Sequence, residues 1–242
     1  GNVRSYIQYN GFDKIVDAED INEGFHKGNL GYHDADVMPW YAEQMSQHQQ
    51  PFFSTLFTQS SHSPYDHPKN FEELKWPKIQ KQYVNSGHYS DMALGMFMEK
   101  ARQQDWYDST LFIIVANHSH VSYKNHRIES FEHHRIPMLI YGEPLQDSLR
   151  GKTFDAICGN TDLPATILAQ LGVTHDEFFW SKNIFGLCYK PFAFFELNNG
   201  LGWKTPEGEF VFSNNGDFIK NNLPEKIKDS VVEDGKSYMQ YH

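Results

Sequence analysis

The chain has 242 residues, 39% of them hydrophobic and 15% aromatic, which suffices for one substantial domain or two small ones and argues against a disordered polypeptide. Its formal net charge of -10 argues against a nucleic-acid-binding surface, because such surfaces concentrate lysine and arginine. Two cysteines, Cys158 and Cys188, are too few for a disulfide framework. No run of roughly 20 apolar residues could cross a bilayer, and the N-terminus lacks a signal-peptide pattern. We therefore expect the chain as given to be soluble.

Residues 1–50 are polar and rich in turn-forming residues, with one short helical pattern at 37–45. Two motifs in this region, Gly-Phe-Asp at 11–13 and the segment 31–36, are interpreted as loops with Asx turns in preference to binding segments. The apolar and β-branched run at 51–57 predicts a strand.

A polar segment, Ser-His-Ser-Pro-Tyr at 61–65, follows this predicted strand. A lone histidine before a proline turn is more often structural, so His62 gains weight only if a second strand end supplies a similar group. After a charged and solvated stretch, apolar residues at helical spacing predict a helix over 83–104 whose apolar face packs on the sheet.

The central feature of the sequence is residues 110–116, an unbroken apolar and β-branched run that predicts a strand buried on both faces, as in a parallel sheet covered by helices. Polar residues begin where this strand ends, with Asn117, His118 and His120. Ligand sites in open α/β sheets collect at the carboxyl ends of strands, so these side chains are candidates to hold a metal or an anion. For an arbitrary histidine pair, a solvated turn is an equally good explanation.

The remaining chain continues with helices and strands before it changes to hairpins. The basic, histidine-rich segment 121–134 predicts a loop that is either solvated or substrate-facing, and 135–142 predicts a strand. Residues 159–171 predict a helix with Thr161 or Asp162 as its N-cap. From residue 191 the pattern predicts antiparallel hairpins, and 223–242 predicts a last helix and a frayed tail.

Several of these segments together resemble the alkaline phosphatase superfamily, in particular the lipoteichoic-acid-synthase-like branch of phosphoglycerol transferases and sulfatase-related proteins. In that family the buried strand ends in Asp-His-Gly, where this chain has Asn117, His118 and Ser119. The histidine segment at 61–65, the strand at 135–142 and the helix at 159–171 also resemble family segments. The resemblance implies an α/β fold with an alkaline-phosphatase-like sheet flanked by helices, present here in part, and a small C-terminal antiparallel β-sheet.

The resemblance also implies roles for the polar residues. His118 and Asn117 correspond to metal ligands, His62 to a catalytic residue that contacts the transferred group, and His120 to a substrate-binding residue. A neutral amide is a weaker partner than a carboxylate for a hard dication, so the substitution at Asn117 weakens the expected metal site. The implied cofactor is a divalent cation (Mn, Mg or Zn) in the complete family site, and the implied substrate is an anionic phosphate or sulfate ester.

The expected organisation is residues 1–190 as the C-terminal part of the catalytic domain, 191–222 as a small antiparallel subdomain, and 223–242 as a polar tail. The family's nucleophile and an acidic metal ligand lie in an upstream half that this chain does not match. The resemblance implies a membrane-anchored parent with an extracytoplasmic catalytic domain. Because the upstream half is missing, we expect self-association of this chain or association with the missing N-terminal segment. The expected function is part of a metal-dependent phosphoryl or sulfuryl ester hydrolase or transferase, inactive as the isolated chain; the alternative is a non-catalytic remnant with a binding or structural role.

Overall fold

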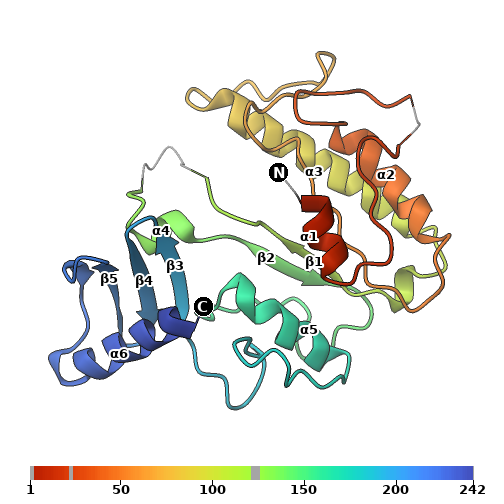
Figure 1. The fold of residues 1–242 in the computed structure, drawn as a ribbon. Coiled ribbons are helices and arrows are strands. Elements are labelled where there is room, and N and C mark those ends of the chain that lie inside the picture. The colour runs from red at the N-terminus through yellow and green to blue at the C-terminus, as the bar shows by residue number, and fades with distance from the viewer. Residues whose placement is uncertain (1–2, 22–23, 121–125, 242) are drawn as a thin grey trace. The chain divides into compact units, whose positions relative to one another are not determined.

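The computed structural model describes residues 3–21, 24–120 and 126–241. The chain forms two compact units, residues 1–110 and residues 111–242. Within the described residues, the first unit carries four helical elements, and the second carries six strands together with the remaining helices (Figure 1). No helix in these residues is both long enough and apolar enough to span a bilayer.

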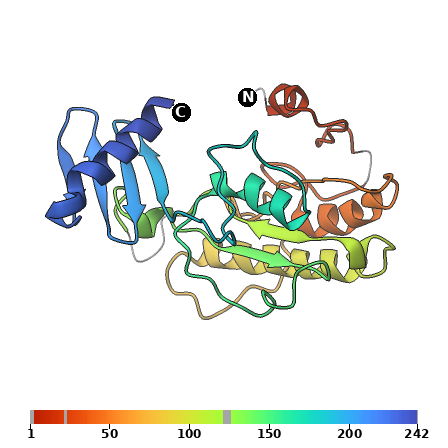
Figure 2. The ribbon, with the colours of Figure 1, turned by 90° about the horizontal axis from the view of Figure 1, so that it is seen from below.

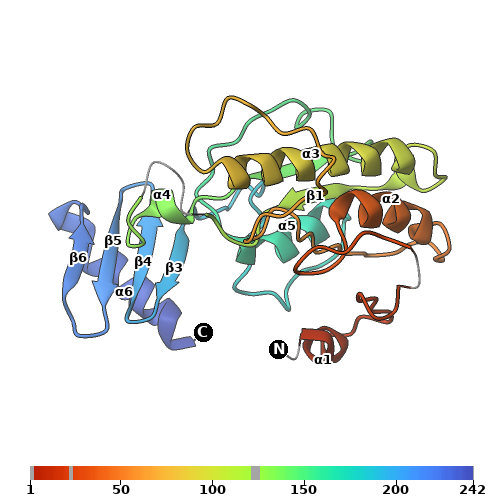
Figure 3. The ribbon, with the colours of Figure 1, turned by 90° about the horizontal axis from the view of Figure 1, so that it is seen from above.

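Helices α2 and α3 form the centre of the first unit and lie side by side (Figures 1 and 3). The helical elements of this unit are α1 (Val3–Tyr9), α2 (Asp34–Met45), α3 (Lys81–Ala101) and the 3-10 turn η1 (Tyr107–Ser109). Apolar residues at helical spacing give each central helix one buried stripe. These residues are Met38, Ala42 and Met45 on α2, and Tyr89, Ala93 and Ala101 on α3. The helices predicted at 37–45 and 83–104 are confirmed.

The strand predicted at 51–57 is not formed in the described structure. These residues belong to no ladder, and Phe53 and Phe57 are 70% and 68% exposed. An apolar run becomes a strand only where a neighbouring strand completes its backbone hydrogen bonds, and the described part of the first unit contains no strand. The prediction is wrong because a sequence pattern cannot supply that partner.

Strands β1 (Phe112–Val115) and β2 (Met138–Tyr141) form a two-stranded antiparallel sheet in the second unit. Val115 lies opposite Met138 in this ladder. Both strands were expected, but the parallel pairing and the two buried faces predicted for the first are wrong, since of its four residues only Phe112 is buried. Apolar composition reports burial and carries no information on strand direction. As a result, the end of β1 lies beside the start of β2.

The antiparallel sheet predicted near the C-terminus is confirmed, with one strand more than the hairpin pattern indicated. It consists of β3 (Ala193–Leu197), β4 (Gly200–Thr205), β5 (Gly208–Ser213) and β6 (Phe218–Asn221), paired in chain order. Helix α6 (Glu225–Tyr241) runs across one face of this sheet (Figure 2). The sheet and the helix share a buried core of Leu201, Trp203, Phe210, Leu223, Val232 and Tyr238. The last helix is therefore packed on the sheet; the division of the chain at 190 and 222 stays a prediction.

Three short elements complete the second unit: α4 (Phe131–His134), the 3-10 turn η2 (Asn160–Asp162) and α5 (Leu163–Gln170). The helix predicted at 159–171 is confirmed. Asp162 is its N-cap residue, one of the two predicted, but the Asp162 carboxylate makes no capping bond to α5 and instead accepts a hydrogen bond from the backbone N–H of Gly159, at 3.1 Å. The carboxylate has a stronger partner elsewhere in the unit, the ammonium group of Lys182.

Candidate functional site

The loop that follows β1, residues 116–120, carries three of the predicted site residues. Asn117 and His118 are exposed, and His120 is half-buried. The Asn117 Oδ1 atom accepts a hydrogen bond from the backbone N–H of His118 at 2.9 Å, so the amide side chain bends back onto its own loop. This contact is the local side-chain bond that asparagine commonly makes at the end of an element.

The ring of His118 has a defined tautomer. Its Nδ1 atom lies 2.7 Å from the carbonyl oxygen of Ser119. A carbonyl can only accept, so Nδ1 must carry the proton, and in the neutral ring Nε2 then carries the lone pair. His118 is thereby prepared to act as a ligand or a hydrogen-bond acceptor through Nε2.

Contacts with two more distant parts of the unit hold this loop in place. The hydroxyl of Ser119 donates to the backbone carbonyl of His133, at the end of α4. On the other side, Asn160 Nδ2 approaches the carbonyl oxygens of Ala116 and Asn117 at 3.5 and 3.4 Å, which is long for a hydrogen bond. The antiparallel pairing of β1 and β2 accounts for the first contact, because it returns the chain from α4 to the end of β1.

Histidines gather around this loop, and two of them, His120 and His134, have lowered pKa values. Burial lowers the pKa of His120, and the neighbouring His118 and His133 lower it further. Burial likewise lowers the pKa of His134, with a smaller contribution from His133. Since like charges disfavour each other at short range, the neighbouring rings add to the effect of burial in disfavouring the protonated forms of His120 and His134.

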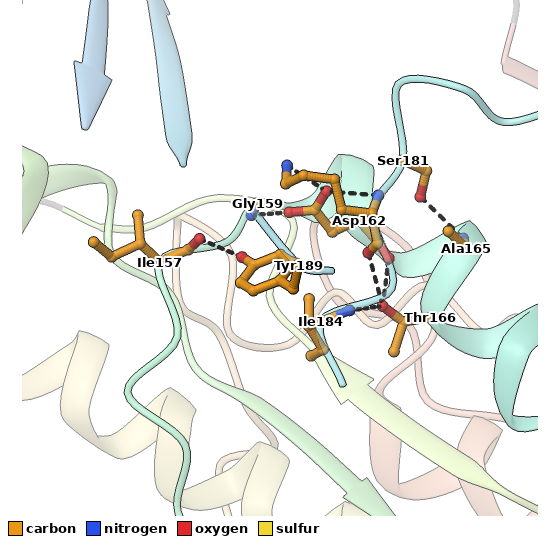
Figure 4. Close-up of polar contacts among 9 residues, drawn as sticks. Ile157, Gly159, Asp162, Ala165, Thr166, Ser181, Ile184 and Tyr189 are labelled. Atoms are coloured by element: carbon orange, nitrogen blue, oxygen red, sulfur yellow. Dashed lines mark hydrogen bonds and ion pairs between the residues drawn. The ribbon is translucent and has the colours of Figure 1, made fainter. Parts of the chain in front are cut away.

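A buried carboxylate, Asp162, anchors the turn that carries Asn160. Its carboxylate accepts from the backbone N–H groups of Gly159 and Lys182, each at 3.1 Å, and Oδ1 lies 2.7 Å from Lys182 Nζ (Figure 4). The hydroxyl of Thr166 donates to the Asp162 carbonyl and accepts from the N–H of Ile184 (Figure 4). The network joins the start of α5 to residues 181–184, so removing its carboxylate would leave a largely buried ammonium group unpaired.

The hydroxyl of Tyr189 makes a further contact beside this network. Tyr189 donates to the carbonyl of Ile157 (Figure 4). Burial raises the pKa of Tyr189, with Asp162 and Cys158 adding to the effect, so the phenol stays protonated and acts as a donor. Burial also raises the pKa of the Cys158 thiol, which disfavours the reactive thiolate.

In the first unit, His62 lies exposed in a tight turn. The N–H of Tyr65 donates to the His62 carbonyl at 2.7 Å. The His62 Nδ1 atom lies 2.7 Å from the Ser63 carbonyl oxygen, which assigns the proton to Nδ1 by the same reasoning as for His118. The two predicted histidines therefore share one tautomer and one local contact, each to the carbonyl of the following residue.

The His62 turn depends on a second buried carboxylate. Asp34, the first residue of α2, accepts from the backbone N–H groups of Gln59 and Ser60, at 3.0 and 3.1 Å, and from the Ser90 hydroxyl at 3.3 Å. In return, the Asp34 N–H donates to Ser60 Oγ at 3.0 Å. These bonds satisfy a charge that is buried in the unit, and they attach residues 59–60 to α2 and α3.

The described residues do not by themselves provide a site for a divalent cation. Nowhere in these residues do three histidine, cysteine, aspartate or glutamate side chains converge in a way that could hold a metal. The Asn117 Oδ1 atom is engaged by the His118 N–H, and hard cations require several oxygen ligands. The donor set on this chain, one exposed imidazole beside a neutral amide, does not fit the family's metal.

The structure thus brings Asn117, His118 and His120 together in one loop and places His62 in the other unit. Their catalytic, metal-binding and substrate-binding roles stay predictions. Sequence reasoning missed Asp34 and did not identify the Asp162 pair with Lys182. Asp34 has a usable signal, since it is an acidic residue shortly before the helix predicted at 37–45, but its partners lie 25 and 26 residues away in sequence.

Comparison with known proteins agrees with the resemblance. A sulfatase family model matches residues 2–173. The chain is 23% identical to lipoteichoic acid synthase 2 of Bacillus subtilis, covering 92% of this chain and 37% of that protein. It is 21% identical to the lipoteichoic acid synthase-like protein YvgJ of the same species, covering 96% and 39%. The chain therefore spans less than two fifths of the length of these curated relatives.

Solved structures give the same result for the fold. The TM-score is 0.77 to a protein in the alkaline phosphatase superfamily from Vibrio parahaemolyticus, with 27% identity, 96% of this chain and 60% of that chain covered. It is 0.70 to the lipoteichoic acid synthase LtaP from Listeria monocytogenes, with 18% identity, 99% and 67% covered. The second likeness concerns the fold only. With the family model matching well over half of its residues, the chain belongs to the sulfatase family and has an alkaline-phosphatase-like fold.

Proposed function

We propose that this chain is the C-terminal part of the catalytic domain of a metal-dependent enzyme that hydrolyses or transfers phosphoryl or sulfuryl groups from an anionic ester. Family membership supports ester chemistry of the sulfatase and phosphoglycerol transferase type. The observation that carries the proposal is the matched pair of exposed histidines, His62 and His118. Each keeps its Nδ1 proton on the carbonyl of the following residue, so that Nε2 serves as the working atom.

The proposed roles follow from this tautomer. His118 offers the Nε2 lone pair to a cation, and Asn117 stands at the position of the family's carboxylate ligand. His62, when its ring is protonated, donates Nε2–H to an oxygen of the phosphate or sulfate group and offsets part of its charge. His120 contacts the substrate from the same loop as His118.

The remaining parts of the site come, in this proposal, from a longer protein. The donor set of the described residues does not fit a metal, so the cation (Mn, Mg or Zn) requires further ligands, and the hydroxyl nucleophile is also supplied from outside these residues. The share of the relatives that this chain covers, 37% and 39%, supports this division. We place the longer protein at the cell membrane with its catalytic domain outside the cytoplasm.

An assay with nitrophenyl phosphate and nitrophenyl sulfate in the presence of manganese tests the proposal. The chain alone, with or without Asn117→Asp, is expected to show no turnover. A longer protein that includes this chain is expected to turn over one of these esters and to lose more than about 100-fold in rate on His118→Ala. His88→Ala, an exposed histidine on α3, serves as the control and should leave the rate unchanged. Turnover by the chain alone that His118→Ala abolishes would contradict the proposal.

One observation favours a second function, a non-catalytic remnant that binds anions without converting them. Asn117 is neutral, and its Oδ1 already accepts from the His118 N–H. The longer protein decides between the two functions. If it shows no turnover until Asn117→Asp is introduced, the natural chain is the remnant.

The proposed partners are the ester substrate and a further polypeptide segment. On β2, Leu139 and Tyr141 are 55% and 40% exposed, an apolar strand surface that proteins ordinarily cover. We expect the isolated chain to self-associate or to retain the missing segment. Light scattering checks this expectation, and a monodisperse monomer without any companion fragment in mass spectrometry would contradict it.

A further inference from the structure

An aromatic residue of the C-terminal sheet, Phe195 on β3, packs against the short helix α4. Its ring is stacked on His134, with centroids 3.8 Å apart and planes at 13°, and it meets Phe131 edge to face at 4.8 Å. On the sheet itself, the ring lies over Gly202 of the neighbouring strand, where a Cβ atom would overlap it. Phe195 is 6% exposed, so it is clamped between the sheet and α4.

Helix α4 is also held from other directions. The His134 Nε2 atom lies 2.7 Å from the Ile128 carbonyl oxygen, which fixes the ring in its plane against Phe195. The ammonium group of Lys204, on β4, lies 5.3 Å from the centre of the Phe131 ring. The backbone N–H of His133 is capped by Ser130 Oγ at 3.3 Å. A helix of four residues has little stability by itself, so these contacts determine where α4 lies.

From α4 the contacts continue to the candidate site. The carbonyl of His133 accepts from the Ser119 hydroxyl, and the carbonyl of Ser119 accepts from His118 Nδ1 at 2.7 Å. The Ser119 residue therefore transmits the position of α4 to the His118 ring. If α4 moves, the carbonyl that holds the Nδ1 proton moves with it, and the alternative tautomer, with the proton on Nε2, becomes accessible.

We propose that Phe195 is a positioning residue for His118: by clamping α4 against the C-terminal sheet, it keeps the Ser119 carbonyl in place and holds Nε2 of His118 as the unprotonated atom. The small antiparallel sheet then has a role in the site although none of its residues belongs to the loop. The relevance of this role to catalysis rests on the proposed function, but the tautomer of His118 is measurable in the absence of any activity.

Asn160 is the competing explanation for the order of the loop. Its Nδ2 reaches the carbonyls of Ala116 and Asn117 at 3.5 and 3.4 Å, which restrains the backbone before His118. It makes no bond to the Ser119 carbonyl among the contacts of the described residues. If Asn160 alone ordered the loop, the loss of the Phe195 ring would leave the His118 tautomer unchanged.

Long-range proton–nitrogen NMR on the full 242-residue chain with 15N-labelled histidine tests the proposal, at a pH of about 8.5 where ordinary imidazoles are neutral. The His118 signals are identified by their loss in His118→Gln. The wild-type chain is expected to show His118 as the Nδ1–H tautomer. Phe195→Leu, which keeps an apolar side chain but removes the ring, is expected to give a mixture of both tautomers and at least about 10-fold faster amide exchange at 118–120. Phe195→Tyr is expected to restore the wild-type signals.

Two further variants make the result decisive. Phe212→Leu removes an aromatic ring from the same sheet without touching α4, and it should leave the His118 signals unchanged. Ser119→Ala breaks the link to His133 without altering the sheet core, and it should reproduce the tautomer mixture even if Phe195→Leu fails to fold. The proposal would be overturned if His118 kept a single Nδ1–H tautomer in both Phe195→Leu and Ser119→Ala. If Phe195→Leu does not fold, a single Nδ1–H tautomer in Ser119→Ala would overturn it. A change in Phe212→Leu equal to that in Phe195→Leu would also overturn it. None of these outcomes depends on ester turnover.

Discussion

The two histidine segments, residues 59–65 and 116–120, have the same local chemistry and different supports. In each, the histidine Nδ1 lies 2.7 Å from the carbonyl of the next residue. The first segment is attached to its unit through a buried carboxylate, Asp34, at the start of α2, and through Tyr65, whose ring meets that of Tyr83 on α3. The second is held by two separate parts of its unit, through Asn160 on η2 and through His133 on α4.

The difference shows two ways of ordering an exposed histidine. A charged acceptor that takes several hydrogen bonds is strong, but its loss removes all of these bonds at once. Support from two elements does not rest on one group, but the contacts from Asn160 are weak, as their 3.4 and 3.5 Å distances indicate. The second arrangement depends on two elements that other residues hold in place: Asp162 holds η2, and Phe195 holds α4.

The largest expected effect comes from Asp162→Asn, beneath the second segment. Lys182, whose side chain is only 16% exposed, would lose its carboxylate partner at 2.7 Å. We expect the second unit to lose about 3–5 kcal/mol of stability, because a buried charge is left uncompensated. Amide exchange of peptides from 157–184 measures the loss. Asp176→Asn, at an exposed position, is the control, and a loss no larger than in the control would show that the pair is dispensable.

A smaller loss is expected from Asp34→Asn, beneath the first segment. The amide has one acceptor oxygen where the carboxylate uses two, so the N–H groups of Gln59 and Ser60 cannot both be satisfied. We expect a destabilisation of about 2–3 kcal/mol, which is measured by amide exchange at 59–65. Asp36→Asn, two positions along the same helix, should cost no more than about 1 kcal/mol because Asp36 bonds to the exposed His26. Equal effects of the two substitutions would contradict the support assigned to Asp34.

The pH dependence of the stability of α4 gives a further test of the comparison. Burial lowers the pKa of His134 below its ordinary value of 6.5. In the pH range between these two values, the unfolded chain binds a proton at His134 and the folded chain does not. The contribution of the neutral His134 ring to stability is fully present above about pH 6.5 and decreases as the pH falls through that window. Amide exchange at 126–134 should therefore accelerate on acidification, after correction for intrinsic rates. His134→Phe removes the titrating group, and an undiminished pH effect in that variant would assign it elsewhere.

The smallest effect is expected from Asn160→Ala. Its contacts to the carbonyls of Ala116 and Asn117 are long, so we expect less than about 1 kcal/mol, confined to faster exchange at 116–118. Asn198→Ala, at the exposed turn between β3 and β4, is the matched control. A global loss of stability in Asn160→Ala would mean that the second segment depends on one strong anchor.

Much of the fold was predictable from local patterns. Helical spacing of apolar residues located α2 and α3, and hairpin turns located the C-terminal sheet, because these signals are contained within each segment. The strand predicted at 51–57 failed for the opposite reason, since a strand exists only with a partner. The antiparallel pairing of β1 with β2 was missed because burial and strand direction are independent properties of a sequence.

The candidate site divides in the same way. The sequence by itself determined which histidines follow apolar runs, and in each case the Nδ1 atom and the carbonyl it contacts belong to neighbouring residues, at His62 and at His118. Only the tertiary structure decided what holds those turns. Asp34 meets residues 25 and 26 positions away, and Ser119 meets His133 across β1 and β2. Such partners are chosen by packing and by the need to satisfy buried polar groups, and neither is written in the spacing of residues along the chain.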